Sequence, residues 1–168
     1  MKTIICNFFI GLLLTGTMVM GQESDRFITR QGQVSFFSYT AVEDIKATNN
    51  QVLSIIDTSK GEIAVKILMR AFLFEKALME EHFNESYVES DLYPELNFVG
   101  TVQGYKGKDF KEGTHLILGE MDFHGVKKNI ELKANAHREK MSLIIEGELE
   151  VAVNDFNIKI PALLSPNI

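Results

Sequence analysis

Residues 141–154 read MSLIIEGELEVAVN, and this stretch decides the fold class. Every second residue from Met141 to Val153 is apolar or glycine, and the residues between them are mostly Glu and Ser. A β-strand points successive side chains to opposite faces, so a period of two buries one face and leaves the other in water. The stretch is therefore predicted to be one long strand, with Leu143, Ile145 and Leu149 pointing inward.

The same alternation recurs from Val34 onward. It is clear in residues 63–69, 96–102 and 130–136. Glycine and charged turn residues separate these runs at positions 59–61, 106–109, 124–125 and 138–140. Short runs joined by such turns are typical of antiparallel neighbours.

Residues 75–84 are the exception to the alternation. Leu78, Met79, His82 and Phe83 fall at helical spacing, whereas the charged residues of this segment fall on the other side. We therefore expect one short helix whose apolar side covers one end of the sheet.

About eight strands and one short helix predict an all-β fold, an antiparallel lipocalin-like β-barrel, because closure removes vulnerable sheet edges. A barrel of this size is either filled by its own side chains or holds one small ligand. Glycines at inward positions, Gly100, Gly119 and Gly147, fit either bends in the strands or an unfilled interior. Both alternatives stay open at this point.

The N-terminus is typical of a signal peptide. Lys2 is followed by an apolar, nearly uncharged run over residues 4–20, and Gly21 precedes the expected cleavage before Gln22. A membrane span would need roughly 20 apolar residues, and this run is shorter and interrupted by polar residues. We expect residues 1–21 to be removed, residues 22–168 to form one domain, and the protein to be periplasmic or secreted.

Composition excludes several classes of function. The only cysteine, Cys6, lies in the expected signal peptide, so the mature domain has no disulfide and no thiol chemistry. The net charge of −6 opposes nucleic-acid binding, which needs clustered Lys and Arg. The four histidines show no metal-ligand spacing, and no catalytic motif is present. We expect no metal, no cofactor and no catalysis.

Residues 82–98 read HFNESYVESDLYPELNF and resemble the YceI-like family of polyisoprenoid-binding, lipocalin-type proteins. That family carries a His before an apolar residue, an aromatic residue shortly after, and a Tyr-Pro dipeptide before a strand with Phe. The matching residues here are His82, Phe83, Tyr87, Tyr93, Pro94 and Phe98. Residues 119–128 and 155–158 resemble two further parts of the family pattern, and the likeness runs from about Val34 to the last residue.

The resemblance has one departure. Members of the family usually continue past the point where residues 160–168 end, with a last strand that helps to close the barrel. The barrel is therefore expected to have an unpaired edge, to receive a strand from a partner chain, or to be covered by its own N-terminal strand. An open edge is a pairing liability, so a homodimer formed through this edge is a further expectation.

The resemblance implies an exported protein that holds a long-chain isoprenoid or similar amphiphilic lipid, of the polyprenyl phosphate or quinone type, inside an apolar barrel. The candidate lumen residues share the inward position: Phe36, Ile67, Met69, Phe98, Val102, Met121, Phe123, Leu132, Leu143, Ile145 and Leu149. His82, Tyr87 and Ser90 are candidates for hydrogen bonds to the lipid headgroup at the rim. Each of them could instead have a purely structural role.

Two other functions remain compatible with the sequence. The first is a non-enzymatic interaction module of the cell envelope, with a filled barrel and an exposed edge strand. The second is a small haem or metal binder. Lipid extracted from the purified protein would separate the carrier from the filled barrel, and absorbance or elemental analysis would reveal haem or metal.

Overall fold

The computed structural model describes residues 25–38, 44–107 and 110–159. The predicted signal peptide and its cleavage site lie outside the described residues. The strands are β1 (Arg26–Ser38), β2 (Ile45–Asp57), β3 (Glu62–Leu68), β4 (Leu73–Phe74), β5 (Glu95–Val102), β6 (Gly113–Phe123), β7 (Val126–Glu139) and β8 (Ser142–Glu148). The helical segments are η1 (Met69–Ala71), α1 (Ala77–His82), the π-helical η2 (Phe83–Tyr87) and η3 (Val153–Phe156).

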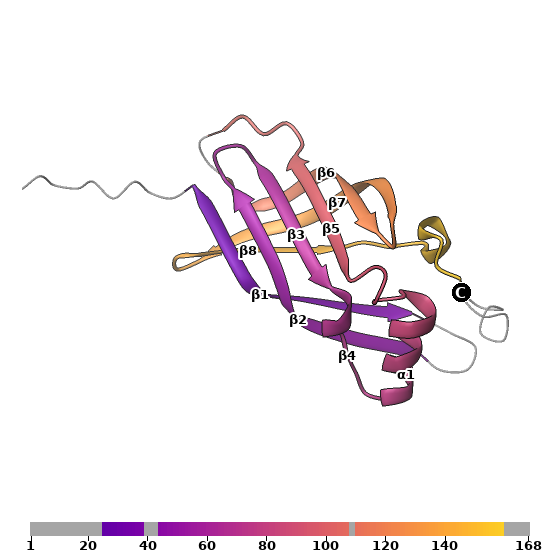
Figure 1. The fold of residues 1–168 in the computed structure, drawn as a ribbon. Coiled ribbons are helices and arrows are strands. Elements are labelled where there is room, and N and C mark those ends of the chain that lie inside the picture. The colour runs from indigo at the N-terminus through magenta and orange to yellow at the C-terminus, as the bar shows by residue number, and fades with distance from the viewer. Residues whose placement is uncertain (1–24, 39–43, 108–109, 160–168) are drawn as a thin grey trace, which may run out of the picture.

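The strands form one antiparallel sheet in the order β1-β2-β3-β5-β6-β7-β8, with the short β4 paired to β2. The sheet curls into a nearly closed barrel, and α1 and η2 lie at one end of it (Figure 1). This confirms the predicted antiparallel β-barrel with about eight strands and one short helix. Among the described residues, β1 and β8 are the two ends of the strand order and do not pair, so a seam remains between them.

The two long strands β1 and β2 bend because their register shifts twice, between Thr29 and Gly32 and between Gly32 and Val34. An extra residue in one strand of a pair increases twist and bends the strand. Gly32 fits this point because a Cβ there would lie 3.1 Å from the carbonyl oxygen of Val52. The bend carries the second half of the hairpin towards β4 and α1 (Figure 1).

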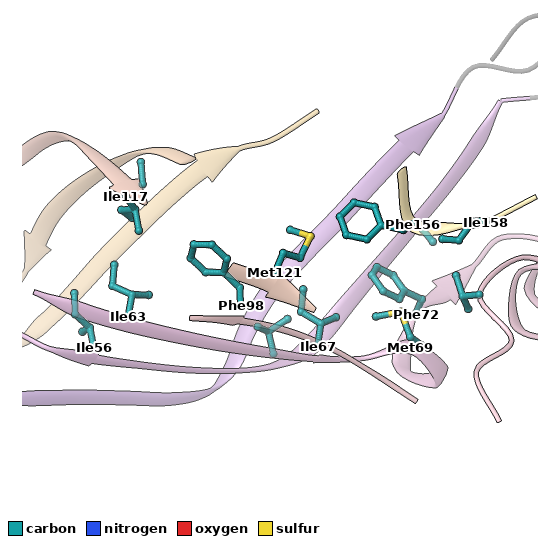
Figure 2. Packing of buried hydrophobic residues seen from close by; sticks show 14 of the residues in the cluster. Ile56, Ile63, Ile67, Met69, Phe72, Phe98, Ile117, Met121, Phe156 and Ile158 are labelled. Atoms are coloured by element: carbon teal, nitrogen blue, oxygen red, sulfur yellow. The ribbon is translucent and has the colours of Figure 1, made fainter. Parts of the chain in front are cut away.

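The core lies on the inward face of the curled sheet. Figure 2 shows Ile56, Ile63, Phe98, Ile117 and Met121 packed together along the interior. At the α1 end the core continues with Met69, Phe72, Phe156 and Ile158, which come from segments far apart in the sequence. The alternation of apolar residues therefore predicted the buried face of these strands.

The sequence-based prediction for residues 141–154 was only partly right. Met141 belongs to the turn between β7 and β8, and the strand ends at Glu148 instead of continuing to Val153. β8 stops because its pairing with β7 stops at Lys133 and Glu148, and Val153 begins η3. Alternation alone therefore does not keep a segment in the sheet: β7 continues over residues 126–132, but the chain after Glu148 turns away from it.

The predicted helix over residues 75–84 is shorter and differently oriented. It spans Ala77–His82, and a π-helical turn follows. The side that faces the protein carries Met79, Phe83 and Tyr87, which are four residues apart. Leu78 is 61% exposed and His82 is exposed, so the expected packing of these two side chains was wrong. Leu78 precedes Met79, and His82 precedes Phe83. Because one residue turns a helix by about 100°, Leu78 and His82 point away from the side that is covered.

The inward glycines allow close packing between strands. Gly100 and Gly119 face each other in the β5–β6 register. A Cβ on Gly119 would lie 2.4 Å from the carbonyl oxygen of Val99 and 2.7 Å from the Phe98 ring, so this ring fills the space above the glycines. A glycine in a strand often marks such a close approach. Of the two alternatives that the sequence left open, the Phe98 ring excludes an unfilled space at Gly100 and Gly119.

No helix in the described part of the chain is both long and apolar enough to cross a membrane.

Candidate lipid-binding surface along the barrel seam

The apolar side chains of the central strands are more deeply buried than those of β1 and β8, the two strands that border the seam. The four central strands β2, β3, β5 and β6 each contribute buried apolar side chains. The seam strands β1 and β8, described over their full length, contribute none. Their inward-facing apolar residues, Phe27, Val34 and Phe36 on β1 and Leu143 and Ile145 on β8, pack against the core and remain half-buried.

The seam is narrowest at one end and open at the other. At the narrow end the guanidinium of Arg138 on β7 lies over the ring of Phe27 on β1, 5.7 Å from its centroid. β8 pairs with residues 133–139 of β7, so in the described chain residues 126–132 of β7 have no partner on the seam side. Ile130 and Leu132 in that half of β7 are half-buried on the inward face.

We refer to the half-buried inward side chains of β1, β7 and β8 as the seam surface. Its members are Phe27, Val34, Phe36, Ile130, Leu132, Leu143 and Ile145. The chain beyond β8 extends it with Leu149 and Val151, which are 37% and 38% exposed. The seam surface and its extension therefore consist of apolar side chains that the protein leaves partly open to water.

Four phenylalanines close the barrel end at which α1 lies. The ring of Phe36 stacks on that of Phe83, with centroids 5.4 Å apart, and meets Phe72 and Phe74 edge-on. Phe72 and Phe74 also contact Phe83. Aromatic pairs in these arrangements stabilise a core beyond the area they bury. This cluster anchors β1, β4 and η2 to one another.

A polar hollow of about 700 Å³ lies near this end. Its walls are formed by Ser86, Tyr87, Glu89, His124, Asn154, Asn157, Ile158 and Lys159. They offer hydroxyl, amide, carboxylate and ammonium groups, whereas Ile158 belongs to the core. The hollow therefore places polar groups beside the apolar interior.

His124 holds the wall of this hollow together. The residue is 8% exposed, its Nδ1 lies 2.9 Å from the carbonyl oxygen of Phe156, and its Nε2 lies 3.1 Å from Oε2 of Glu89. Its ring packs on Tyr93, with centroids 4.2 Å apart. His124 and Gly125 have φ of 51° and 73° and form the two-residue turn between β6 and β7. Positive φ at both central residues is typical of a hairpin turn.

The structure places the predicted lumen residues in three groups. Ile67, Met69, Phe98, Val102 and Met121 are buried in the core. Phe36, Phe123, Leu132, Leu143 and Ile145 are half-buried, and four of these belong to the seam surface. Leu149 was expected inside the barrel but is exposed beyond the end of β8, because the chain there has left the sheet.

The three predicted rim residues do not form one cluster. His82 is exposed on α1, whereas Tyr87 lines the polar hollow and is half-buried. Burial raises the pKa of the Tyr87 hydroxyl above its usual value, so this group remains a neutral donor. Ser90 is 1% exposed, and its hydroxyl has no partner among the described residues.

Sequence analysis missed the contribution of His124. A His-Gly pair between two alternating runs indicated the turn, but no pattern indicated that the imidazole would fold back onto η3. Among the described residues, no group of three or more His, Cys, Asp or Glu side chains is arranged to hold a metal ion.

The barrel, its seam and the polar hollow at one end define a lipocalin-type β-barrel. Residues 26–168 match the model of the YceI-like domain, and the chain therefore belongs to the YceI-like family. No curated protein matches it.

Two solved structures share the fold. One is a polyisoprenoid binding domain from Saccharophagus degradans implicated in plant cell wall breakdown, with 13% identity and a TM-score of 0.66 over 82% of this chain and 83% of that chain. Another is the YCEI protein of Campylobacter jejuni, with 14% identity and a TM-score of 0.50 over 100% of this chain and 93% of that chain.

Proposed function

We propose that this chain is an exported, non-enzymatic protein that binds a long-chain isoprenoid or similar amphiphilic lipid. The observation that carries the proposal is the difference in burial across the barrel: the central strands are packed, whereas the seam surface remains half-buried. The fold shared with a polyisoprenoid binding domain supports the same class of ligand.

The seam surface suits an apolar chain because burial of apolar area stabilises a complex by roughly 25 cal/mol per Å². A prenyl chain that lies against Phe36, Leu132, Leu143 and Ile145 would remove these side chains from water. Five of the predicted lumen residues are buried in the core: Ile67, Met69, Phe98, Val102 and Met121. We infer that the lipid obtains space by parting the seam, where the apolar side chains are only half-buried.

The polar hollow suits the headgroup. Tyr87, Asn154, Asn157 and Lys159 supply hydrogen-bond donors there, and His124 fixes the position of the Glu89 carboxylate. A phosphate or a quinone carbonyl is an acceptor, so either headgroup matches these donors. A few polar groups beside a large apolar surface are typical of lipid and cofactor sites.

The test is native mass spectrometry of protein purified without detergent, followed by organic extraction and uptake of added polyprenyl phosphate or ubiquinone. Ile145→Glu places a charge on the seam surface, and Ile144→Glu places the same charge on the outward face of the same strand. We expect bound lipid in the wild type and the Ile144 variant, and loss of it in the Ile145 variant. Equal uptake by both variants, or none by any protein, would contradict the proposal.

A second candidate function is an envelope interaction module. The observation in its favour is the edge of β8, which has no partner strand among the described residues, with the exposed Leu149 and Val151 beyond it. A strand from a partner, or from a second copy of the chain, would pair there. Protein without lipid that forms complexes sensitive to a proline in β8 would favour this function.

Export is the remaining part of the proposal. It rests on the apolar run after Lys2 and on Gly21 before Gln22. N-terminal sequencing of protein from the periplasm or culture medium should begin at Gln22. Protein that retains Met1 in the cytoplasm would contradict it.

A further inference from the structure

The outward face of the barrel carries an apolar row that crosses four strands. The register aligns Ile28 on β1 with Ile55 on β2, Ile55 with Ala64 on β3, and Ala64 with Val99 on β5. Ile28 is 59% exposed and Val99 is 62% exposed. Single exposed apolar residues are ordinary, whereas an aligned row across neighbouring strands is typical of an interaction surface.

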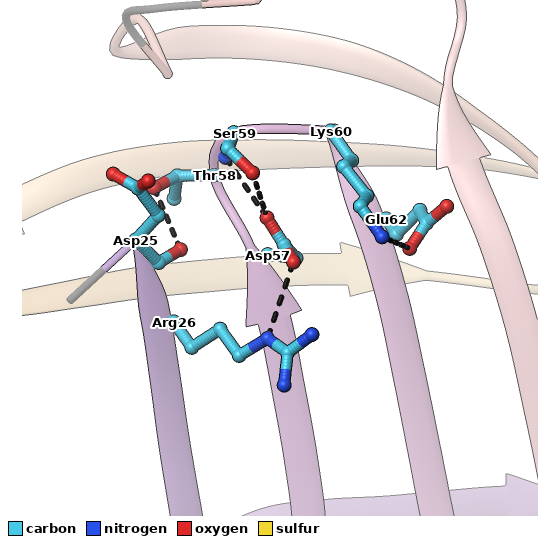
Figure 3. A network of polar contacts seen from close by, with 7 residues as sticks. All are labelled: Asp25, Arg26, Asp57, Thr58, Ser59, Lys60 and Glu62. Atoms are coloured by element: carbon cyan, nitrogen blue, oxygen red, sulfur yellow. Dashed lines mark hydrogen bonds and ion pairs between the residues drawn. The ribbon is translucent and has the colours of Figure 1, made fainter.

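A hollow of about 380 Å³ lies beside this row. Its apolar lining includes Ile55, Ala64, Val99 and Leu118, and Arg26, Asp57 and Glu62 form its charged rim. Figure 3 shows this rim, where Arg26 reaches Asp57 and Lys60 reaches Glu62 at 3.8 Å. Arg26 pairs with Asp57, whereas the contact between Lys60 and Glu62 is long and exposed, so Glu62 is the carboxylate that a further lysine can approach. The aliphatic stem of such a lysine would pack on the apolar lining while its ammonium stays near the charge of Glu62.

The outward residues of β3 are arranged as an acid, a small residue and a base. Glu62, Ala64 and Lys66 follow one another at every second position, with Ala64 at the centre. Consider a two-fold axis that lies between two stacked sheets, perpendicular to the strands and level with Ala64. It would place β3 of one copy antiparallel to the β3 of a second copy. Each Glu62 would then face the Lys66 of the other copy, and the apolar row would stack on itself.

We propose that a second copy of this chain docks on this outward face, with its Lys66 in the hollow beside Glu62. An isologous interface requires a surface that is complementary to itself. The charge pattern along β3 meets this requirement only when the two strands are antiparallel, because in a parallel arrangement like charges would face each other. Sheets pack face to face in this way, roughly 10 Å apart.

The exchange of ion pairs that docking requires is not costly. Lys66 pairs with Glu95 at 2.7 Å, and the two side chains are 42% and 33% exposed. Exposed pairs contribute little, typically below about 1 kcal/mol, so Lys66 can change its partner readily. The interface is small, and we expect a weak dimer in the micromolar range or above.

This dimer would leave lipid binding undisturbed. The docking face lies on the outward side of the sheet, and Ile28 places only one end of its apolar row on the seam strand β1, whereas the seam surface consists of inward-facing side chains. The seams of both copies would therefore remain open, and failure of the dimer would not affect the proposed lipid site.

The decisive experiment uses charge reversal with sedimentation velocity over a range of protein concentrations. Glu62→Lys and Lys66→Glu alone would each bring like charges together and should be monomeric. The double variant E62K/K66E restores complementarity and should dimerise. An equimolar mixture of the two single variants should form a heterodimer, because each then supplies the charge that the other lacks.

A second pair of variants tests the apolar row. Val99→Asp should weaken the dimer at least tenfold, whereas Leu78→Asp, at a position with nearly the same exposure on α1, should leave it unchanged. A wild type that stays monomeric at the highest concentration overturns the proposal. A dimer that survives both single reversals and instead responds to a proline in β8 also overturns it in favour of edge pairing.

Discussion

The guanidinium of Arg138 lies over the ring of Phe27 and joins β7 to β1 across the seam, 5.7 Å from the ring centroid. The two residues are 111 positions apart, and their strands do not pair in the described chain. The contact closes the narrow end of the seam, whereas the cluster of Phe36, Phe72, Phe74 and Phe83 joins β1 to β4 and η2. The seam surface beyond the Arg138 contact is the part of the barrel whose strands can separate most easily.

Arg138→Ala should loosen the narrow end of the seam. A cation–π contact at an exposed site contributes under about 1 kcal/mol, so the variant should fold normally. We expect faster hydrogen exchange in β1 and faster release of a bound prenyl lipid. Lys133→Ala, on the outward face of the same strand, is the control. Unchanged release from the Arg138 variant would mean that the lipid does not leave through the seam.

Gly119→Ala should destabilise the barrel by about 1–3 kcal/mol, the usual cost of overpacking. The new methyl group would lie 2.4 Å from the carbonyl oxygen of Val99, and backbone cannot move aside without breaking the β5–β6 ladder. Gly100→Ala should cost less, because its nearest contact at 2.8 Å is the tip of the Phe98 ring. Chemical denaturation of both variants checks this order, and equal midpoints would be inconsistent with it.

His124→Ala should cost about 1–3 kcal/mol, because it leaves the Phe156 carbonyl and the Glu89 carboxylate without their partner. It should also loosen the backbone of η3, although Phe156 stays packed on Phe123 and Lys128 still pairs with Asp155 at 3.0 Å. Hydrogen exchange around residues 153–158 measures the local effect. His137→Ala is the control, since its contact with Glu139 is 3.8 Å long and exposed. Protection of η3 that is the same in both variants would argue against this role.

Asp57 should make stability depend on acid pH. The hydroxyl of Ser59, with help from Arg26 and the Ser59 amide, lowers the pKa of Asp57 from 3.8 to about 2, although desolvation acts in the opposite direction. A carboxyl with a lowered pKa binds a proton less readily in the folded state than in the unfolded state. Its contribution to stability is therefore complete above about pH 4 and is lost as the pH falls towards 2.

The variant Asp57→Asn tests this contribution. Its free energy of unfolding should fall less steeply than that of the wild type between about pH 4 and pH 2, and the curves should be parallel above that range. Asp155→Asn, another ion-paired carboxylate, shows the effect of removing a negative charge in general. Identical slopes for the wild type and Asp57→Asn would show that the Ser59 and Arg26 contacts do not form in solution.

The sequence by itself determined the fold class and the inward face of most strands. Alternation in residues 63–69 and 96–102 predicted the burial of Ile63, Ile67, Phe98 and Val102 because a strand has a period of two. Residues 82–98 also carried enough of the family pattern to indicate the YceI-like family. These features are local, and a local pattern can be read without knowing its neighbours.

Only the tertiary structure decided where the barrel stays open and what closes it. Leu149 and Val151 continue the alternation of β8 but lie outside the sheet, because the chain turns towards η3 after Glu148 although β7 continues. His124 became a structural centre through Glu89 and Phe156, each more than 30 residues away. Strand pairing, the seam and such long-range contacts depend on which distant segments lie side by side. A local sequence pattern does not specify these neighbours or the register between them.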